Sequence, residues 1–452
     1  MACSRWQSMA FVAALLPLLA SGEAFENDLS AGTDEVLTLN SHHPAFGAEL
    51  PTATADLTFD STELDSLDDM LATVVAGERR LETGKSVDLT RLETFFGVEM
   101  ELDLTKLPTQ AERHPIAWPS SYWPVYADSI NYRWAGDDVL SPAEKYATSF
   151  GHDVDTFVDS VSTNNGINSQ AKRTACTADA DCAALKDGSV CAMRRGHSQG
   201  YCIPTWFGIC HAWAPAAILE AEPTCAVVRN GTTFEPYDIK ALLTLAYEGS
   251  NIPTVFTGTR FNGPDVEPNN TDRYGRYTNA KRRDLSPGFF HIAITNIMGL
   301  QNHSFVVDVT AGAEVWNQPA RGFQVREMAW YTPQTAARKF YNTTEYPFNA
   351  NATWLVKTTT RFMWVVEAGE NGPLVATGAV DKYTQFADYQ YLLETDDEYR
   401  ILGGEWIGES NQIHPDFLWL PAAKPDNSTT TDVGLVYAEV EELLAASVTG
   451  DC

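Results

Sequence analysis

Residues 206–220 read Trp206-Phe207-Gly208-Ile209-Cys210-His211-Ala212-Trp213-Ala214-Pro215-Ala216-Ala217-Ile218-Leu219-Glu220. After Gly208 the run is apolar and rich in alanine, which predicts a buried helix with Cys210 close to its first turn. The unpaired amides and the positive end of the helix dipole at that position favour a thiolate over a thiol. The stretch therefore predicts a reactive cysteine at the start of a core helix.

The start of the chain predicts export. An apolar run from Met9 to Ala20 follows Arg5 and ends in small residues up to Ala24, which is typical of a secretory signal peptide covering residues 1–24. Export places the protein in an oxidising environment that permits disulfides. Six Asn-x-Ser/Thr sites also predict a glycosylated extracellular surface, at Asn230, Asn269, Asn302, Asn342, Asn351 and Asn427.

The cysteine count separates Cys210 from the others. The chain has 8 cysteines, and loss of Cys3 with the signal leaves an odd number. Four of them lie in the polar stretch 176–202 and are predicted to pair among themselves in a disulfide-rich insertion, with open connectivity: Cys176, Cys182, Cys191 and Cys202. A zinc site is the less favoured reading because the stretch has no CxxC pair. Cys225 and Cys452 would form a third bridge, which leaves Cys210 free.

A free thiolate needs a base, and the sequence offers two candidates. His291 lies in the alternating stretch 288–295 and Asp308 in the stretch 304–310, both of which predict strands. If these strands pair antiparallel through a turn at residues 299–300, His291 stands opposite Asp308, close enough for the carboxylate to hold the imidazole. This predicts a Cys210–His291–Asp308 triad. The alternative is His303 with Asn317 as the orienting group, although a glycan on Asn302 would crowd such a site.

His211 is a poor partner for Cys210 on the same reasoning. Its side chain should point about 100° around the helix from the neighbouring position.

The sequence identifies only part of an oxyanion hole. The Cys210 amide is one plausible donor, but the sequence assigns no second one.

Charge restricts both the partners and the domain organisation. With 31 Lys+Arg against 60 Asp+Glu the net charge is −29, which excludes nucleic-acid binding as a main activity. No internal apolar run is long enough to span a membrane.

Residues 25–112 hold 19 acidic and 5 basic residues, a net −14, and predict an acidic propeptide or a disordered leader with order starting near His114. Within it, residues 92–107 could cover the active-site cleft, or could be a solvated extension.

A family resemblance comes from residues 314–327, which read Glu314-Val315-Trp316-Asn317-Gln318-Pro319-Ala320-Arg321-Gly322-Phe323-Gln324-Val325-Arg326-Glu327. The stretch closely resembles the surface peptide by which plants recognise the secreted transglutaminase elicitors of Phytophthora and related oomycetes. The family peptide usually has valine, lysine and tyrosine where this chain has Ala320, Gln324 and Arg326. The positions that match the family peptide are Val315, Trp316, Asn317, Gln318, Pro319, Arg321, Gly322 and Phe323. The resemblance extends over roughly residues 115–450.

The resemblance implies a fold, an activity and a location. The fold would be α+β, with a core similar to papain-like cysteine proteases and a catalytic domain over residues 113–452 that carries an elicitor-like surface segment at 315–327. The activity would be Ca²⁺-dependent cross-linking of protein glutamine and lysine side chains, in the cell wall or the plant apoplast, with a plant cell-surface receptor as a further partner. No calcium ligands can be named, because Asp179-Ala180-Asp181 lacks the glycine and glutamate of an EF-hand loop.

Two alternatives remain open at the level of the sequence. The same triad would serve a papain-like cysteine endopeptidase, because triad geometry alone does not separate transfer to an amine from hydrolysis. The chain could also be a catalytically silent elicitor that acts only as a ligand for a plant receptor.

Overall fold

A computed structural model describes residues 37–50, 86–263, 271–283 and 285–450. The predicted signal peptide lies outside these residues, as do residues 25–36 and 51–85 of the predicted leader and Cys452. Among the described helices, none has the length and apolar character needed to cross a bilayer.

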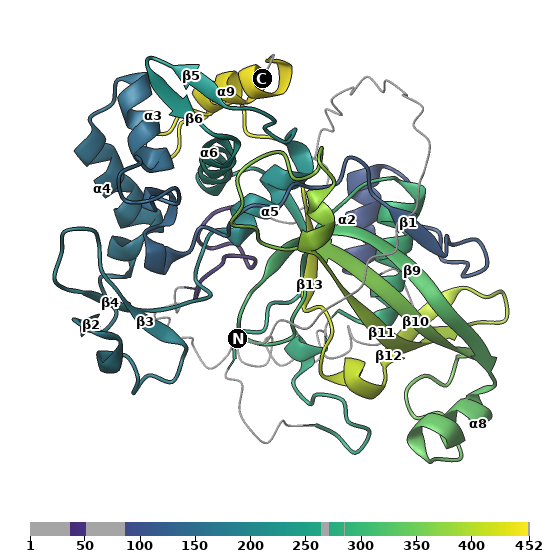
Figure 1. Cartoon of the computed structure of the whole chain (residues 1–452). Helices are drawn as coiled ribbons and strands as arrows, with labels where there is room; N and C mark the ends of the chain where they lie inside the picture. The colour runs from purple at the N-terminus through teal and green to yellow at the C-terminus, as the bar shows by residue number, and fades with distance from the viewer. Residues whose placement is uncertain (1–36, 51–85, 264–270, 284, 451–452) are drawn as a thin grey trace, which may run out of the picture. The chain divides into compact units, whose positions relative to one another are not determined.

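An eight-stranded antiparallel sheet organises the described residues (Figure 1). Its strands follow the order β12 (Ile401–Trp406), β11 (Thr384–Thr395), β10 (Trp354–Val365), β9 (Asn317–Tyr331), β8 (Val306–Asp308), β13 (Phe417–Pro421) and β7 (Thr254–Gly258), and β1 (Gln110–Glu112) pairs with β9 outside this path. The three longest strands, β9, β10 and β11, form a continuous meander. The cysteine-bearing helix contacts β9 and, to a smaller extent, the short strand β8.

Both faces of this sheet are covered, and the strand residues alternate between two cores. Along β13, Phe417 and Trp419 belong to one apolar cluster, whereas Leu418 and Leu420 belong to the other. This is the period of two that a strand imposes on its side chains. The sheet therefore separates two environments, and any residue can be assigned to one face by the cluster in which it packs.

The first face carries the helix predicted from residues 206–220. That helix is α5 (Cys210–Leu219), which packs on β9 and against α6 (Pro236–Glu248). Further helices complete this side, namely α3 (Pro142–Phe150), α4 (Val154–Asn165) and α9 (Tyr437–Thr449) (Figure 1). The second face carries α7 (Pro287–Ile294), which lies on β11 and β12, and α2 (Val87–Phe96), which lies beside β7. The predicted α+β class, with a cysteine-bearing helix on an antiparallel sheet, is confirmed.

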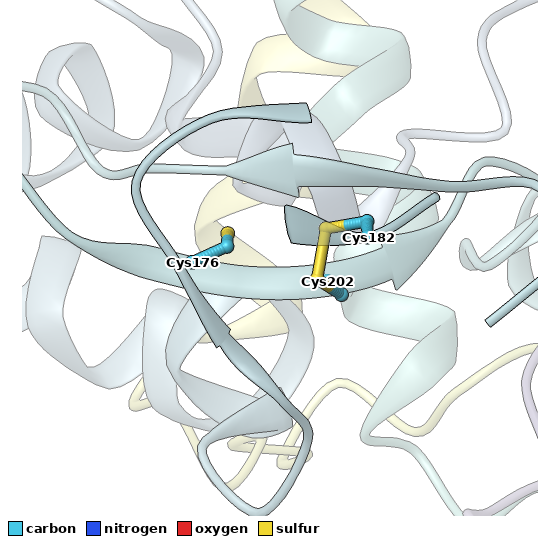
Figure 2. Close-up of side chains that lie close together, drawn as sticks. All are labelled: Cys176, Cys182 and Cys202. Atoms are coloured by element: carbon cyan, nitrogen blue, oxygen red, sulfur yellow. A yellow bond between two sulfur atoms is a disulfide. The ribbon is translucent and has the colours of Figure 1, made fainter. Parts of the chain in front are cut away.

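The predicted disulfide-rich insertion forms a small sheet of its own. Strands β2 (Ala175–Cys176), β4 (Gly200–Pro204) and β3 (Ser189–Ala192) pair in that order. The insertion is closed by two disulfides, Cys176–Cys191 and Cys182–Cys202. Figure 2 shows the second of these with the Cys176 side chain close by. A two-stranded ribbon, β5 (Val227–Arg229) with β6 (Thr232–Phe234), connects α5 to α6.

The strand predicted for residues 288–295 is wrong, because these residues form helix α7. Ser286 caps the helix by accepting the Phe289 amide, and Pro287 occupies the first turn, where its missing N–H costs nothing. All eight residues of α7 are buried, so the run is apolar on every side and has no helical period to read.

Ordered structure also begins well before His114. Helix α2 and strand β1 both fall within the predicted leader, and residues 37–50 pack on the helical side. The segment 92–107, for which the sequence left open a role in covering the active-site cleft, packs on the α7 side through Leu92, Met100, Leu104 and Leu107. Its leucines are buried in the second core, so they are part of the folded domain rather than a solvated extension.

Candidate active site around Cys210

Cys210 is the free thiol that the cysteine count predicts. It is the first residue of α5 and is 1 % exposed. Cys225 is disulfide-bonded, and its predicted partner Cys452 lies outside the described residues. Because Cys210 opens the helix, its backbone amide has no carbonyl to bond within the chain as far as it is described. The sulfur thus lies beside an unused amide at the positive end of a helix dipole.

Asn317 contacts the sulfur from the sheet. Its Nδ2 lies 3.4 Å from the Cys210 Sγ. Its Oδ1 accepts a hydrogen bond from the Trp419 Nε1 at 3.0 Å, and because an indole nitrogen can only donate, the amide cannot be flipped. A buried donor is therefore fixed against the Cys210 sulfur by a neighbouring strand.

His211 is also part of the environment of Cys210. The ring is completely buried, and its Nε2 forms an ion pair with Glu248 at the end of α6. Burial lowers the pKa of His211, but Glu248 and Cys210 outweigh burial and raise that pKa to about 9. The interaction with Cys210 places the ring beside the thiol although the two residues are adjacent in sequence. His211 is therefore a candidate base, although helix geometry alone argued against it.

Asp308 lies at the end of β8, in register with Asn317 on β9. Its Oδ1 accepts the Trp316 amide at 3.0 Å, whereas its Oδ2 is buried and makes no hydrogen bond to any residue that the structure describes. Burial raises the pKa of Asp308 to about 7, against the opposing effect of these hydrogen bonds and of Arg260. Asp308 thus borders the site but holds no imidazole.

The predicted triad is not assembled. His291 packs on the α7 side of the sheet, and its Nδ1 lies 2.8 Å from the Tyr391 hydroxyl. Burial lowers the pKa of His291 to about 3, so the ring stays neutral. The pairing with Asp308 is wrong because residues 288–295 are helical and β8 pairs with β9 and β13 instead.

The alternative base fails for a similar reason. His303 makes edge contacts with Phe95 and Phe96, which also belong to the α7 side, so it does not reach Asn317 or Cys210. Asn317, the orienting group of that alternative, does reach the site, but it contacts the sulfur directly.

Part of the predicted leader lies across the thiol. The Ala45 carbonyl accepts a hydrogen bond of 2.7 Å from the Asn317 Nδ2, and the Gly47 amide donates to the His211 Nδ1 at 3.0 Å. Sequence reasoning missed this segment because nothing local in it marks a binding role.

The segment 315–327 is largely interior, although it was predicted to be a surface element. It runs into β9, and residues 317–320, 322 and 323 are buried between β8 and β10. Gln324, Arg326 and Glu327 are exposed.

Five of the six predicted glycosylation sites are exposed, namely Asn230, Asn302, Asn342, Asn351 and Asn427. The sixth, Asn269, lies outside the described residues.

The described residues contain one cluster of side chains of the types that bind metals. Over the described ranges, the only group of three metal-ligating side chains within 4.8 Å of one another is Cys176, Cys182 and Cys202. These sulfurs are held in disulfides (Figure 2) and cannot act as thiolates. Asp181 accepts the amides of Thr177 and Ala178, so it serves a local turn. Calcium dependence stays a prediction from the family resemblance, and no step below depends on the ion.

The unusual pKa of Asp308 gives a stability prediction. Between pH 3.8 and about 7 the native state holds a proton that the unfolded state has lost, so this contribution to stability is full at low pH and disappears as the pH rises through 7. As the pH is raised from 4 to 7.5, we expect the free energy of unfolding of Asp308→Asn to rise by roughly 2–4 kcal/mol relative to that of the wild type. Urea unfolding at both pH values measures this, with exposed Asp397→Asn as the control. A difference that does not change with pH would contradict the assignment.

The site thus consists of a buried free cysteine at the start of a core helix, packed on an antiparallel sheet, with the Asn317 amide and the His211 imidazole close to it. The model of the transglutaminase elicitor family matches residues 88–450, and the chain belongs to that family. The chain is similar to the crystal structure of the GP42 transglutaminase from Phytophthora sojae, with 49% sequence identity, a TM-score of 0.74, and coverage of 80% of this chain and 98% of that one. No curated protein matches it.

Proposed function

We propose that this protein is an extracellular protein-glutamine γ-glutamyltransferase, with Cys210 as its nucleophile and His211 as its base. The observation that carries the proposal is the unbridged Cys210 sulfur, which contacts a fixed amide donor within a transglutaminase-like fold and is followed in the chain by a carboxylate-paired histidine whose pKa it helps to raise. The family supports glutamine and lysine side chains as the reacting groups.

The first half of the reaction uses the site as follows. The Cys210 thiolate attacks the carboxamide carbon of a glutamine side chain, and a carbon–sulfur bond forms as the carbon–nitrogen bond breaks. The protonated His211 gives its proton to the departing ammonia. Glu248 keeps the imidazole oriented and stabilises its charged form, as the carboxylate of a triad does.

The second half transfers the acyl group. A lysine amine attacks the thioester and loses its proton to the neutral His211, and the carbon–sulfur bond breaks to restore the thiolate. The negative oxygen that develops in both halves needs donors close to the sulfur. The free Cys210 amide and the Asn317 Nδ2 fill this role, and the second of these already holds a carbonyl oxygen, that of Ala45.

An amine-incorporation assay tests the function. The wild-type protein, both intact and after limited proteolysis within residues 51–85, is incubated with a glutamine-rich protein and a fluorescent primary amine. We expect covalent fluorescence in the substrate, with mass spectrometry showing one ammonia lost for each amine gained. Cleavage of casein without amine incorporation would favour the endopeptidase. Absence of both reactions in both forms would contradict an enzyme.

The ligand alternative makes a separate prediction for the segment 315–327. Because most of its side chains are buried in β9, a receptor on plant cells should respond less to the folded protein than to the free peptide at equal concentration. An equal response to both would favour recognition of the few exposed positions. Export through a signal peptide, glycosylation and a plant receptor as partner stay part of the proposal.

A further inference from the structure

Residues 44–48 are held over the active site by main-chain contacts. The Arg260 guanidinium donates to the carbonyls of Pro44 at 3.1 Å, Phe46 at 2.8 Å and Ala48 at 2.8 Å. The Gly208 amide donates to the Gly47 carbonyl at 2.9 Å. All four bonds go to backbone carbonyls of the segment, so the chain around Cys210 recognises a polypeptide backbone rather than particular side chains.

Arg260 makes no other side-chain hydrogen bond in the described structure, although the charges of Asp308 and Asp416 act on it from a longer distance. It is 4 % exposed, its three hydrogen bonds all go to this segment, and no carboxylate of the described chain lies within ion-pair distance. A buried guanidinium is normally paired with an acid, because an unpaired buried charge is costly. Here backbone carbonyls of the leader replace the acid, and removal of the leader would leave the groove lined by unsatisfied donors.

The segment also occupies the reacting positions. The Ala45 carbonyl lies on the Asn317 amide where the oxyanion would develop, and the Gly47 amide fills the Nδ1 lone pair that His211 needs as a base. The Gly47 amide therefore competes with a proton for Nδ1. A Cβ on Gly47 would come within 2.3 Å of the Gly208 carbonyl oxygen and 3.2 Å of the Cys210 Sγ. Only a residue without a side chain fits this closely over the sulfur.

Contacts on the N-terminal side of the segment fix it in place. The Leu39 amide donates to the Ile252 carbonyl at 2.9 Å, and the buried His43 ring lies 2.9 Å from the Thr254 hydroxyl. On the other side the chain continues into residues 51–85, which contain the dibasic pair Arg79-Arg80, a sequence typical of proteolytic processing sites.

We propose that residues 44–48 are a built-in pseudosubstrate, and that the groove they fill is the binding site for the backbone of the glutamine-bearing polypeptide, with Arg260 as its main-chain anchor. This inference rests on the proposed function for the identity of the ligand, but the occlusion of Cys210 does not. In the intact chain the thiol is covered and the base is engaged, so the leader has to leave before a polypeptide donor can bind.

Alkylation of Cys210 tests the occlusion without any enzyme assay. The full chain is prepared with a site for a sequence-specific protease between residues 51 and 85, and iodoacetamide labelling of Cys210 is followed by mass spectrometry. We expect the labelling rate to rise at least about tenfold after cleavage and removal of the released segment, and to fall again when a synthetic peptide of residues 37–50 is added. An unchanged rate after the segment has been removed would overturn the proposal.

A variant of the uncut chain provides a second route. Gly47→Val should displace the segment by its clash with Gly208 and raise the labelling rate without cleavage. His42→Val, at an exposed position of the same segment, is the matched control and should label like wild type. Equal labelling of Gly47→Val and His42→Val would contradict a covering role.

The substrate-binding part of the proposal has its own measurement. In the cleaved protein, Arg260→Gln should raise KM for a polypeptide glutamine donor by roughly tenfold and leave KM for a small glutamine amide without a flanking chain nearly unchanged. Equal effects on both donors would overturn Arg260 as the main-chain anchor. If alkylation responds to cleavage but no amine is incorporated by any form, the occlusion stands and the proposed transferase activity fails.

Discussion

Replacing His211 by glutamine is expected to lower amine incorporation by roughly 10⁴-fold, close to the loss from Cys210→Ala, and the double replacement should lose little more. The reason is that thiolate and base act as one unit, so removing either removes both contributions. In this chain the unit consists of a sulfur at the start of α5 and the neighbouring ring held by Glu248. Initial rates on the leader-cleaved protein measure the effect, and circular dichroism checks that each variant folds.

Two other histidines provide the controls for that experiment. His291→Gln and His303→Gln lie on the α7 side of the sheet and should retain amine incorporation within a few fold, once any loss of stability is corrected. Near-complete loss in His291→Gln with retained activity in His211→Gln would reverse the assignment and restore the base predicted from the sequence. Glu248→Gln should give an intermediate loss and shift the pH profile, because Glu248 raises the pKa of His211.

The free thiol could be predicted from the sequence because it depends on local and countable features. An odd cysteine number after removal of the signal, a polar cluster of four cysteines and a glycine before an alanine-rich run together identified Cys210. The helix over residues 210–219 followed from composition and length. These features need no information about which distant segments meet.

The residues around this thiol could not be predicted in the same way, because their positions depend on non-local packing. A fully buried helix such as α7 has no polar face, so its residues fit the pattern of a strand equally well, and the cap formed by Ser286 and Pro287 was the one signal that could have decided. Strand β8 was predicted, but its partner was not: Asp308 pairs with Asn317 of β9. The contact of Glu248 with His211 joins two helices and leaves no trace in the sequence around either residue.

The elicitor-like segment is a case in which a correct motif led to an incorrect placement. The string 315–323 identified the family, yet its residues lie between β8 and β10 and supply Asn317 to the site. A function in catalysis and one in recognition would therefore use the same residues. This overlap makes Asn317 the position at which the two can be separated by experiment.

Asn317→Leu is expected to lower kcat by roughly 10²–10³-fold with little change in KM, because a leucine of similar size has no donor for the developing oxyanion. The loss should fall on kcat, since the donor acts on charge that is present only in the transition state. Steady-state rates of amine incorporation on the leader-cleaved protein measure both constants. A proportionate rise in KM with unchanged kcat would contradict the oxyanion role.

Trp419→Phe provides the matched variant for this prediction. It removes the Nε1 donor that fixes the Asn317 amide but leaves the amide in place, so we expect a loss of about tenfold from misorientation alone. The test compares the losses in kcat of the two variants. A larger loss in Trp419→Phe than in Asn317→Leu would mean that packing of the indole, and not the amide donor, supports the reaction. Thermal unfolding of both variants separates these cases, because the fully buried Trp419 contributes to the first core whether or not its nitrogen is bonded.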